Sequence, residues 1–258
     1  MKVLLTNDDG IWSRGLAALA QAAVGLTNWE VYVVAPDRER SACGHSITIH
    51  EPIYVEEVEF KAAPVAGAWR VSGTPADCTK IGIELLVKEK PAVLISGVNR
   101  GPNLGTDILY SGTVSAAMEG CLYGIPSIAV SLADFRATEF GLAANIGVRL
   151  ARLVLELDDG PNLFNVNVPA VDASEIKGVL VTSMGRTRYR DRFEGRKDSV
   201  GRDCFWLTGD MVEVENQDHA DVKAVKRGYV SITPLHLDLT ASSLMTKIQS
   251  WPLHQLLG

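Results

Sequence analysis

The chain alternates short apolar runs with segments of helical spacing, and this alternation constrains its fold more than any other feature. Residues 2–6 (KVLLT) predict a buried strand, and residues 15–26 carry Ala and Leu at helical spacing. The same order recurs, with strands expected within residues 29–40, 92–97 and 125–132, and helices from Thr74 and within 111–124. Such repeats need right-handed crossovers. The sequence therefore predicts a Rossmann-like three-layer α/β/α sandwich with a mostly parallel sheet.

The composition and the predicted secondary structure of the chain change near residue 178. A helix within 140–157 and a strand within 162–169 continue the first pattern, so a Rossmann-like core over about 1–177 is expected. Residues from about 178 have short β-like runs, many Arg and Asp, and few helical faces, which predicts β-hairpin extensions. Residues 241–258 suit a short terminal amphipathic helix that packs on this subunit or a neighbour. We expect one domain over 1–258, with about 178–258 serving oligomerisation.

Composition excludes several classes of function. With 258 residues and a formal net charge of -6, the chain lacks the clustered positive charge that a nucleic-acid polymer requires. No apolar stretch approaches the roughly 20 residues of a membrane helix, and the N-terminus is unlike a signal peptide. The cysteines form no C-x-x-C pair and are expected to be reduced and buried; they are Cys43, Cys78, Cys121 and Cys204. We expect a cytoplasmic protein with no membrane partner.

Two adjacent aspartates, Asp8 and Asp9, follow the first predicted strand. A turn permitted by Gly10 can bring both carboxylates toward one point. Two anions held close repel each other unless a cation lies between them or one is protonated, and a divalent cation is the simpler solution. The alternative is that one aspartate caps the following helix and the other is solvated. The remaining loops must decide between these interpretations.

The long loop of residues 96–113 is dense in Gly and Asn, which is uncommon unless backbone approaches a ligand closely. It ends where Ser111, Gly112 and Thr113 would begin a helix. Free N–H groups, hydroxyl donors and the helix dipole make that position a ready phosphate site. Ligands of an open parallel sheet bind beyond the carboxyl ends of its strands, where this loop would lie.

The loops also offer oxygen ligands for a metal. Asn99 follows a middle strand and Ser41 follows the second strand; with the two aspartates they form a hard-oxygen set that favours Mg²⁺ or Mn²⁺ over zinc. The histidines show no zinc spacing. His45 and His50 also follow the second strand; a histidine near a phosphate could act as an acid or base, although packing of the loop is the simpler role.

Five sequence blocks, in register, resemble the SurE (survival protein E) family of stationary-phase nucleotidases. They are LLTNDDG (4–10), VVAPDRERSACGHSIT (33–48), GTPADC (73–78), SGVNRGPNLGTDILYSGTVSAAMEG (96–120) and GYVSITPLHLDLT (228–240). The resemblance implies a metal-dependent phosphatase of nucleoside 5′- and 3′-monophosphates, with possible action on short polyphosphate. It also implies a dimer or tetramer that exchanges C-terminal segments.

The resemblance also implies roles for individual residues. One divalent cation per subunit, Mg²⁺ or Mn²⁺, would be held by Asp8, Asp9, Ser41 and Asn99. Phosphate would be contacted by Asn103, Ser111, Gly112 and Thr113.

The catalytic step stays open between two versions. Either Asp8 or Asp9 serves as the base for an attacking water, with Asp8 preferred, or one aspartate attacks phosphorus directly. A different class, a receiver-like Mg²⁺-binding signalling module, also has an acidic pair after its first strand. That class needs an acceptor aspartate after a middle strand, where this chain has Asn99, and it is usually about half as long.

Overall fold

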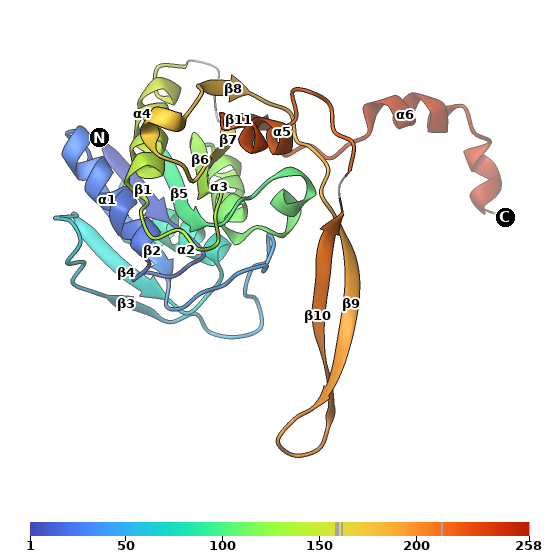
Figure 1. The fold of residues 1–258 in the computed structure, drawn as a ribbon, viewed down its shortest axis with the longest axis horizontal. Helices are drawn as coiled ribbons and strands as arrows, with labels where there is room; N and C mark the ends of the chain where they lie inside the picture. The colour runs from blue at the N-terminus through green and yellow to red at the C-terminus, as the bar shows by residue number, and fades with distance from the viewer. Residues whose placement is uncertain (158–159, 161, 213, 258) are drawn as a thin grey trace.

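A mostly parallel sheet forms the centre of the molecule (Figure 1). The computed structural model describes residues 1–157, 160, 162–212 and 214–257, which form a nine-stranded sheet of order β3-β4-β2-β1-β5-β6-β7-β11-β8 and a separate two-stranded hairpin, β9–β10. Strands β4, β2, β1, β5, β6 and β7 run parallel, whereas β3 and β11 pair antiparallel with β4 and β7. The predicted fold class is confirmed.

The strands have the following bounds: β1 (Lys2–Thr6), β2 (Glu30–Pro36), β3 (Val55–Glu57), β4 (Gly67–Val71), β5 (Val93–Arg100), β6 (Ser127–Leu132), β7 (Leu163–Val168), β8 (Val179–Val181), β9 (Arg188–Lys197), β10 (Asp203–Val212) and β11 (Val230–Leu235). The helices are α1 (Arg14–Leu26), α2 (Pro75–Ile81), α3 (Gly112–Leu122), α4 (Gly141–Val154), α5 (Asp221–Lys226) and α6 (Ser242–Gln249). Short helical turns are η1 (Gly82–Leu86), η2 (Gly105–Tyr110), η3 (Ala173–Glu175) and η4 (Leu253–Leu257).

Helices cover both faces of the sheet. Helices α1 and α4 pack together on one face, and α2 and α3 pack on the other. Within β1, Val3 and Leu5 join the core beneath α1, whereas Leu4 joins the core beneath α3. Burial on both faces explains why this strand is an uninterrupted apolar run in the sequence. Within the described part of the chain, no helix combines the length and apolar character that a membrane span requires.

Local signals at the helix starts are confirmed. The Thr74 side chain caps α2 and forms a reciprocal capping box with Asp77, while Pro75 occupies the first turn. The Ser111 side chain caps α3 by accepting a hydrogen bond from the backbone N–H of Val114. These helices therefore begin where the sequence predicts, and the start of α3 lies at the end of the glycine-rich loop.

The sheet extends beyond the expected core boundary at residue 177. Strand β11 pairs with β7 and β8, so two segments expected in the extension are strands of the main sheet. A few β-like residues do not reveal their partner in the sequence. The hairpin β9–β10 and α6 do project from the body (Figure 1). None of the described residues of α6 is buried.

Gly15 in α1 provides a test of the packing between this helix and β5. A Cβ atom at Gly15 would lie 1.9 Å from the backbone oxygen of Val98, whereas a Cβ at Gly25 in the same helix meets nothing within 4 Å. We expect Gly15→Ala to lower the free energy of unfolding by about 1–3 kcal/mol, because backbone must move. Gly25→Ala should change it by less than about 1 kcal/mol, in the stabilising direction. Urea unfolding of both variants checks this, and equal stability would contradict it.

Candidate active site

The two aspartates lie at the carboxyl end of β1, in a turn fixed by polar contacts. The Asn7 side-chain amide donates to the backbone oxygen of Gly10 (3.0 Å) and to Ser13 Oγ (2.7 Å). Gly10 has a φ of +95°, a conformation that favours glycine. Asp8 is buried, with 5% of its surface exposed, and Asp9 is partly buried. The turn therefore places two carboxylates side by side at the edge of the core.

Neither aspartate caps the next helix. The N-cap residue of α1 is Ser13, whose Oγ accepts a hydrogen bond from the backbone N–H of Leu16 (3.3 Å). The alternative interpretation of the acidic pair, a helix cap beside a solvated neighbour, is therefore wrong. Burial of Asp8 needs another explanation.

The start of α3 lies directly against Asp8. Thr113 Oγ1 donates a hydrogen bond of 2.5 Å to Asp8 Oδ1. A Cβ atom on Gly112 would lie 2.8 Å from Asp8 Cβ and 3.1 Å from Cys43 Sγ, so a larger residue would displace the carboxylate. The structure thus brings Asp8, Gly112 and Thr113 together, as predicted from two distant blocks of sequence. The Thr113 hydroxyl is directed at Asp8, so its contact with phosphate stays a prediction.

Both carboxylates are held in an environment that disfavours negative charge. Burial raises the pKa of Asp8 to about 7; the charge of Asp9 adds to this, and the hydrogen bond from Thr113 opposes it. Burial also raises the pKa of Asp9, as does the charge of Glu39, while the backbone N–H of Arg100 lowers it. A cation bound between the two carboxylates would relieve this repulsion.

Asn99 and Ser41 are each linked to the acidic pair through another residue, and their roles as metal ligands stay predictions. The Asn99 side-chain amide donates to the backbone oxygen of Gly101 (2.9 Å), which leaves its Oδ1 available as a ligand. The next residue, Arg100, donates its backbone N–H to Asp9 Oδ2 (3.2 Å). Ser41 is exposed and donates to Glu39 Oε1 (2.7 Å), so it is connected to the Asp9 environment through Glu39.

The donor set fits a hard divalent cation. Two carboxylates, an amide oxygen and a hydroxyl are the oxygen ligands that Mg²⁺ and Mn²⁺ take in proteins. Among the described residues, no group of three or more His, Cys, Asp or Glu side chains could hold a metal ion. A cation beside Asp8 and Asp9 would therefore depend on neutral oxygens such as that of Asn99.

The predicted phosphate residues divide into two groups. Ser111 is buried at the start of α3, and the N–H of Gly112 precedes the first intrahelical hydrogen bonds. Asn103 lies in a different polar cluster: its backbone N–H donates to Asn167 Oδ1 (2.8 Å) and its side-chain amide to Ser131 Oγ (2.8 Å). The structure gives Asn103 a role in fixing the loop to β6 and β7, and its phosphate contact stays a prediction.

Buried carboxylates that the sequence analysis did not single out hold the loops in place. Glu119 accepts hydrogen bonds from Lys80 Nζ and pairs with His45 Nε2, each at 2.8 Å. Burial favours a higher pKa for Glu119, but these two partners lower it overall. Asp221 accepts from the backbone N–H groups of Gly105 (2.9 Å) and Gly185 (2.8 Å). These contacts favour loop packing as the role of His45, and no local signal marks the pairing in the sequence.

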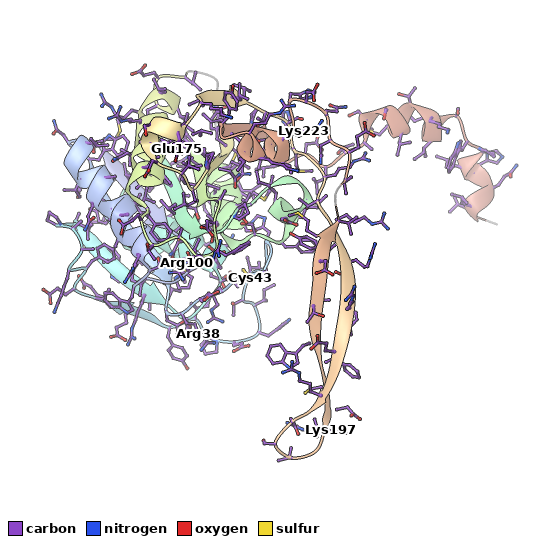
Figure 2. All side chains as sticks on the ribbon, in the orientation of Figure 1. Arg38, Cys43, Arg100, Glu175, Lys197 and Lys223 are labelled. Carbon is purple, nitrogen blue, oxygen red and sulfur yellow. The ribbon has the colours of Figure 1, made fainter. Side chains whose placement is uncertain are left out.

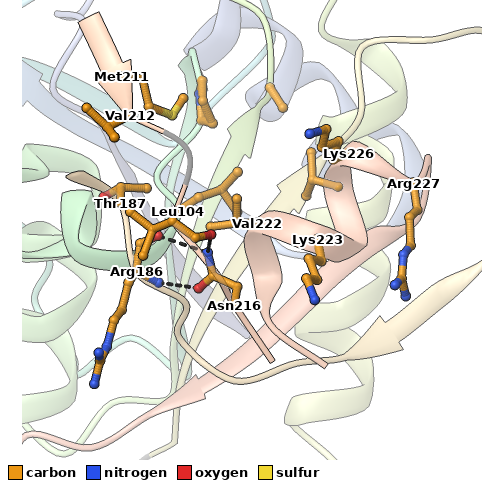
Figure 3. A pocket seen from close by; sticks show the side chains of 14 residues that line it. Leu104, Arg186, Thr187, Met211, Val212, Asn216, Val222, Lys223, Lys226 and Arg227 are labelled. Atoms are coloured by element: carbon orange, nitrogen blue, oxygen red, sulfur yellow. Dashed lines mark hydrogen bonds between the residues drawn. The ribbon is translucent and has the colours of Figure 1, made fainter. Parts of the chain in front are cut away.

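Two cavities near the loops differ in chemistry. A cavity of about 300 Å³, here called the Asp9 cavity, is lined by Asp9 together with Arg38 and Arg100. The two arginines are labelled on the same side of the molecule in Figure 2. A larger cavity of about 730 Å³ lies between the loop at Leu104, the root of the hairpin and α5 (Figure 3). Neither predicted carboxylate lines the larger cavity. Of the predicted site residues, Asp9 alone lines the smaller cavity, so this cavity adjoins the candidate active site on the side of Asp9.

The raised pKa of Asp8 leads to a prediction about stability in the absence of metal. An unfolded Asp ionises near 3.8 and folded Asp8 near 7. The protonated Asp8 carboxyl therefore contributes fully to the free energy of unfolding below about pH 4, and this contribution is lost as the pH rises through 7. Asp8→Asn keeps an acceptor for Thr113 without the charge, so in EDTA its free energy of unfolding at pH 8 should exceed that of the wild type by on the order of 2–4 kcal/mol.

The two proteins should be equally stable near pH 4. Asp198→Asn is the control, because hydrogen bonds from Arg202 lower the pKa of that half-buried carboxyl and no gain in stability is expected. Urea unfolding at both pH values measures the difference. A stability gain for Asp8→Asn that is independent of pH would contradict the prediction.

Comparison with known proteins gives a consistent result. The family model "Survival protein SurE" matches residues 3–191. The chain is 48% identical to a protein from Symbiobacterium thermophilum, and the match covers 97% of this chain and 98% of that protein. It is 46% identical to a protein from Heliobacterium modesticaldum, over 97% of this chain and 92% of that protein. Both relatives are named 5′-nucleotidase SurE. The crystal structure of SurE from Aquifex aeolicus superposes with a TM-score of 0.80 at 39% identity, over 96% of this chain and 98% of that one. The chain belongs to the SurE family.

Proposed function

We propose that this protein is a divalent-metal-dependent phosphatase that hydrolyses nucleoside 5′-monophosphates, and also 3′-monophosphates, to nucleoside and phosphate. The observation that carries the proposal is the contact between a buried acidic pair and the N-terminus of α3, made by Thr113 and Asp8. A site for a cation and a site for an anion therefore adjoin. The name 5′-nucleotidase SurE, carried by the relatives, supports the choice of substrate. Short polyphosphate presents the same terminal group and is included as a substrate.

One set of residues would hold the metal, and another would hold the phosphate group. Asp8, Asp9, Asn99 and Ser41 would hold one Mg²⁺ or Mn²⁺, which when bound neutralises phosphate charge and orients the group for in-line displacement. The Ser111 hydroxyl and the N–H of Gly112 would hold phosphate oxygens, with support from the dipole of the 11-residue helix α3.

Asp8 is the preferred base. Burial raises its pKa in the absence of a metal, and a bound cation would lower that pKa, so Asp8 would be ionised and able to accept a proton at neutral pH. Thr113 occupies Oδ1 of Asp8, so Oδ2 is the oxygen that would take the proton of the attacking water. The other version, direct attack by an aspartate, would leave a phosphoaspartate. Trapping that species during turnover would overturn the role of Asp8 as base.

The receiver-like alternative loses support. Such a module needs an acceptor aspartate after a middle strand, and Asn99 stands near the end of β5. Membership of the SurE family points to a different class of protein. Repeated release of phosphate from a nucleotide without a kinase partner would eliminate the alternative.

Metal-dependent hydrolysis is the direct test of the proposed function. We expect phosphate release from nucleoside 5′-monophosphates to require Mg²⁺ or Mn²⁺ and to stop in EDTA. Asp8→Asn and Asp9→Asn should each lower kcat/KM by at least about 100-fold, because each removes charge from the site. The control is Asp172→Asn, an exposed helix-start residue at η3 that should retain full activity. Full activity in EDTA, or in both site variants, would refute the proposal.

We also propose a homo-oligomer, a dimer or tetramer with exchanged C-terminal segments, acting in the cytoplasm. The support is an unburied apolar segment: the described part of α6 and η4 buries no residue, and the segment projects from the body (Figure 1). Its exposed apolar side chains are Leu244, Met245, Ile248, Trp251, Leu253, Leu256 and Leu257. A second copy would cover them. None of the four cysteines, all within the described residues, forms a disulfide, which suits a reducing compartment. Cys43 and Cys204 are only partly buried, contrary to expectation.

Truncation tests the exchanged segment. A chain ending at Thr240 lacks α6 and η4 but keeps every strand of the sheet. We expect light scattering to give a smaller assembly for the truncated chain than for the full chain. The circular dichroism spectrum of the truncated chain should still be that of a folded α/β protein, since the core is kept. The same mass per particle for both chains would contradict the exchange. A full-length variant that carries Leu244→Ser and Ile248→Ser should also form a smaller assembly than the wild type.

A further inference from the structure

Trp12 occupies an unusual position beside the acidic pair. It lies three residues after Asp9, between β1 and α1, and 60% of its surface is exposed. Its neighbour Ile11 is fully buried and supplies the core contact of this turn. Packing of the core therefore does not account for a large aromatic ring at position 12.

The indole forms a wall shared by two cavities. Trp12 lines the Asp9 cavity of about 300 Å³ and also a neighbouring cavity of about 370 Å³, with Ile11 and Ser13 common to both. The first is at the lower end of the size range of ligand pockets. The second adjoins the first, because the two share these lining residues. A ligand anchored at Asp9 could therefore extend along Trp12.

The chemistry changes from one cavity to the next. The Asp9 cavity is lined by two arginines and three carboxylates, so an anionic group there would rely on the guanidinium groups and on the proposed cation; these residues are Arg38, Arg100, Asp9, Asp37 and Glu39. The neighbouring cavity is lined by Phe60, Ala17 and Ala62, with Glu59 and Lys61 as its charged residues. A substrate that carries an anionic group at one end and a flat, weakly polar ring at the other matches this order.

We infer that the indole of Trp12 stacks on the nucleobase of the substrate. This inference rests on the proposed nucleotidase function and specifies which part of the substrate is recognised beyond the phosphate. Every base has a π-face, so stacking discriminates weakly among bases but strongly against phosphate esters that lack a base. The protein should therefore prefer nucleotides, and purines more than pyrimidines because of their larger ring area.

Adenosine 5′-monophosphate and ribose 5-phosphate form the decisive pair of substrates, because they share the phosphate and the sugar and differ in the base. We expect Trp12→Ala to lower kcat/KM for adenosine 5′-monophosphate by about 5- to 100-fold, mainly through KM, the range that one stacked base supplies. Activity on ribose 5-phosphate should stay the same within about twofold, since no stacking is lost. Trp12→Phe keeps an aromatic face and should restore most of the nucleotide activity.

Trp206→Ala is the matched control. Trp206 is also 60% exposed but lies in β10 of the projecting hairpin, so the ratio of the two substrates should not change. As a binding readout independent of hydrolysis, adenosine 5′-monophosphate should quench tryptophan fluorescence in the wild type and much less in Trp12→Phe.

The outcomes separate this inference from the proposed function. Absence of phosphate release from both substrates by the wild-type protein would refute the nucleotidase itself. Release from both, with a substrate ratio that Trp12→Ala leaves unchanged, would overturn the role of Trp12 alone. A parallel loss on both substrates would also overturn it, because that result indicates damage to the turn that carries Asp9.

Discussion

Burial of two adjacent carboxylates, taken out of water at the end of β1, is the constraint on which the candidate site depends. Asp8 is buried and Asp9 partly so, and burial raises the pKa of both. Such a pair is costly unless something compensates for its charge. The described residues supply a hydroxyl from Thr113 and a backbone N–H from Arg100, which are hydrogen-bond donors without a full opposing charge at bonding distance. This uncompensated charge supports the proposed cation, and the start of α3 beside it supports the proposed phosphate contact.

The loops that complete the site are fixed by other buried acids, which are fully partnered. Asp77 accepts hydrogen bonds from the backbone and hydroxyl of Thr48 as well as capping α2. Glu119 holds the same loop through His45, and Asp221 holds the glycine-rich loop through Gly105. Partnered carboxylates of this kind stabilise loop geometry, because an acceptor in a dry interior binds N–H groups strongly. Acidic side chains therefore have two separate uses here, one structural and one chemical.

The sequence predicts most of the sheet and the positions of the chemistry, but little of how the loops are held. Thr74 and Ser111 mark helix starts by local chemistry, so both caps could be located in advance. Strand β11 has six residues, as many as β6 and β7, but it could not be placed because its pairing with β7 and β8 is decided by packing. The Asn103 contacts with Ser131 and Asn167 join segments more than 25 residues apart, and no local pattern encodes such a pairing.

The sequence by itself determined the alternation of strands and helices, the helix caps, and the residue types near the carboxyl edge of the sheet, because these follow from local periodicity and turn chemistry. Only the tertiary structure decided that Asp8 is buried against Gly112 and Thr113, and that Trp12 lines two adjoining cavities. The physical reason is that burial, pKa and cavity shape depend on which distant segments meet. Proximity along the chain does not specify those meetings; packing of both faces of the sheet does.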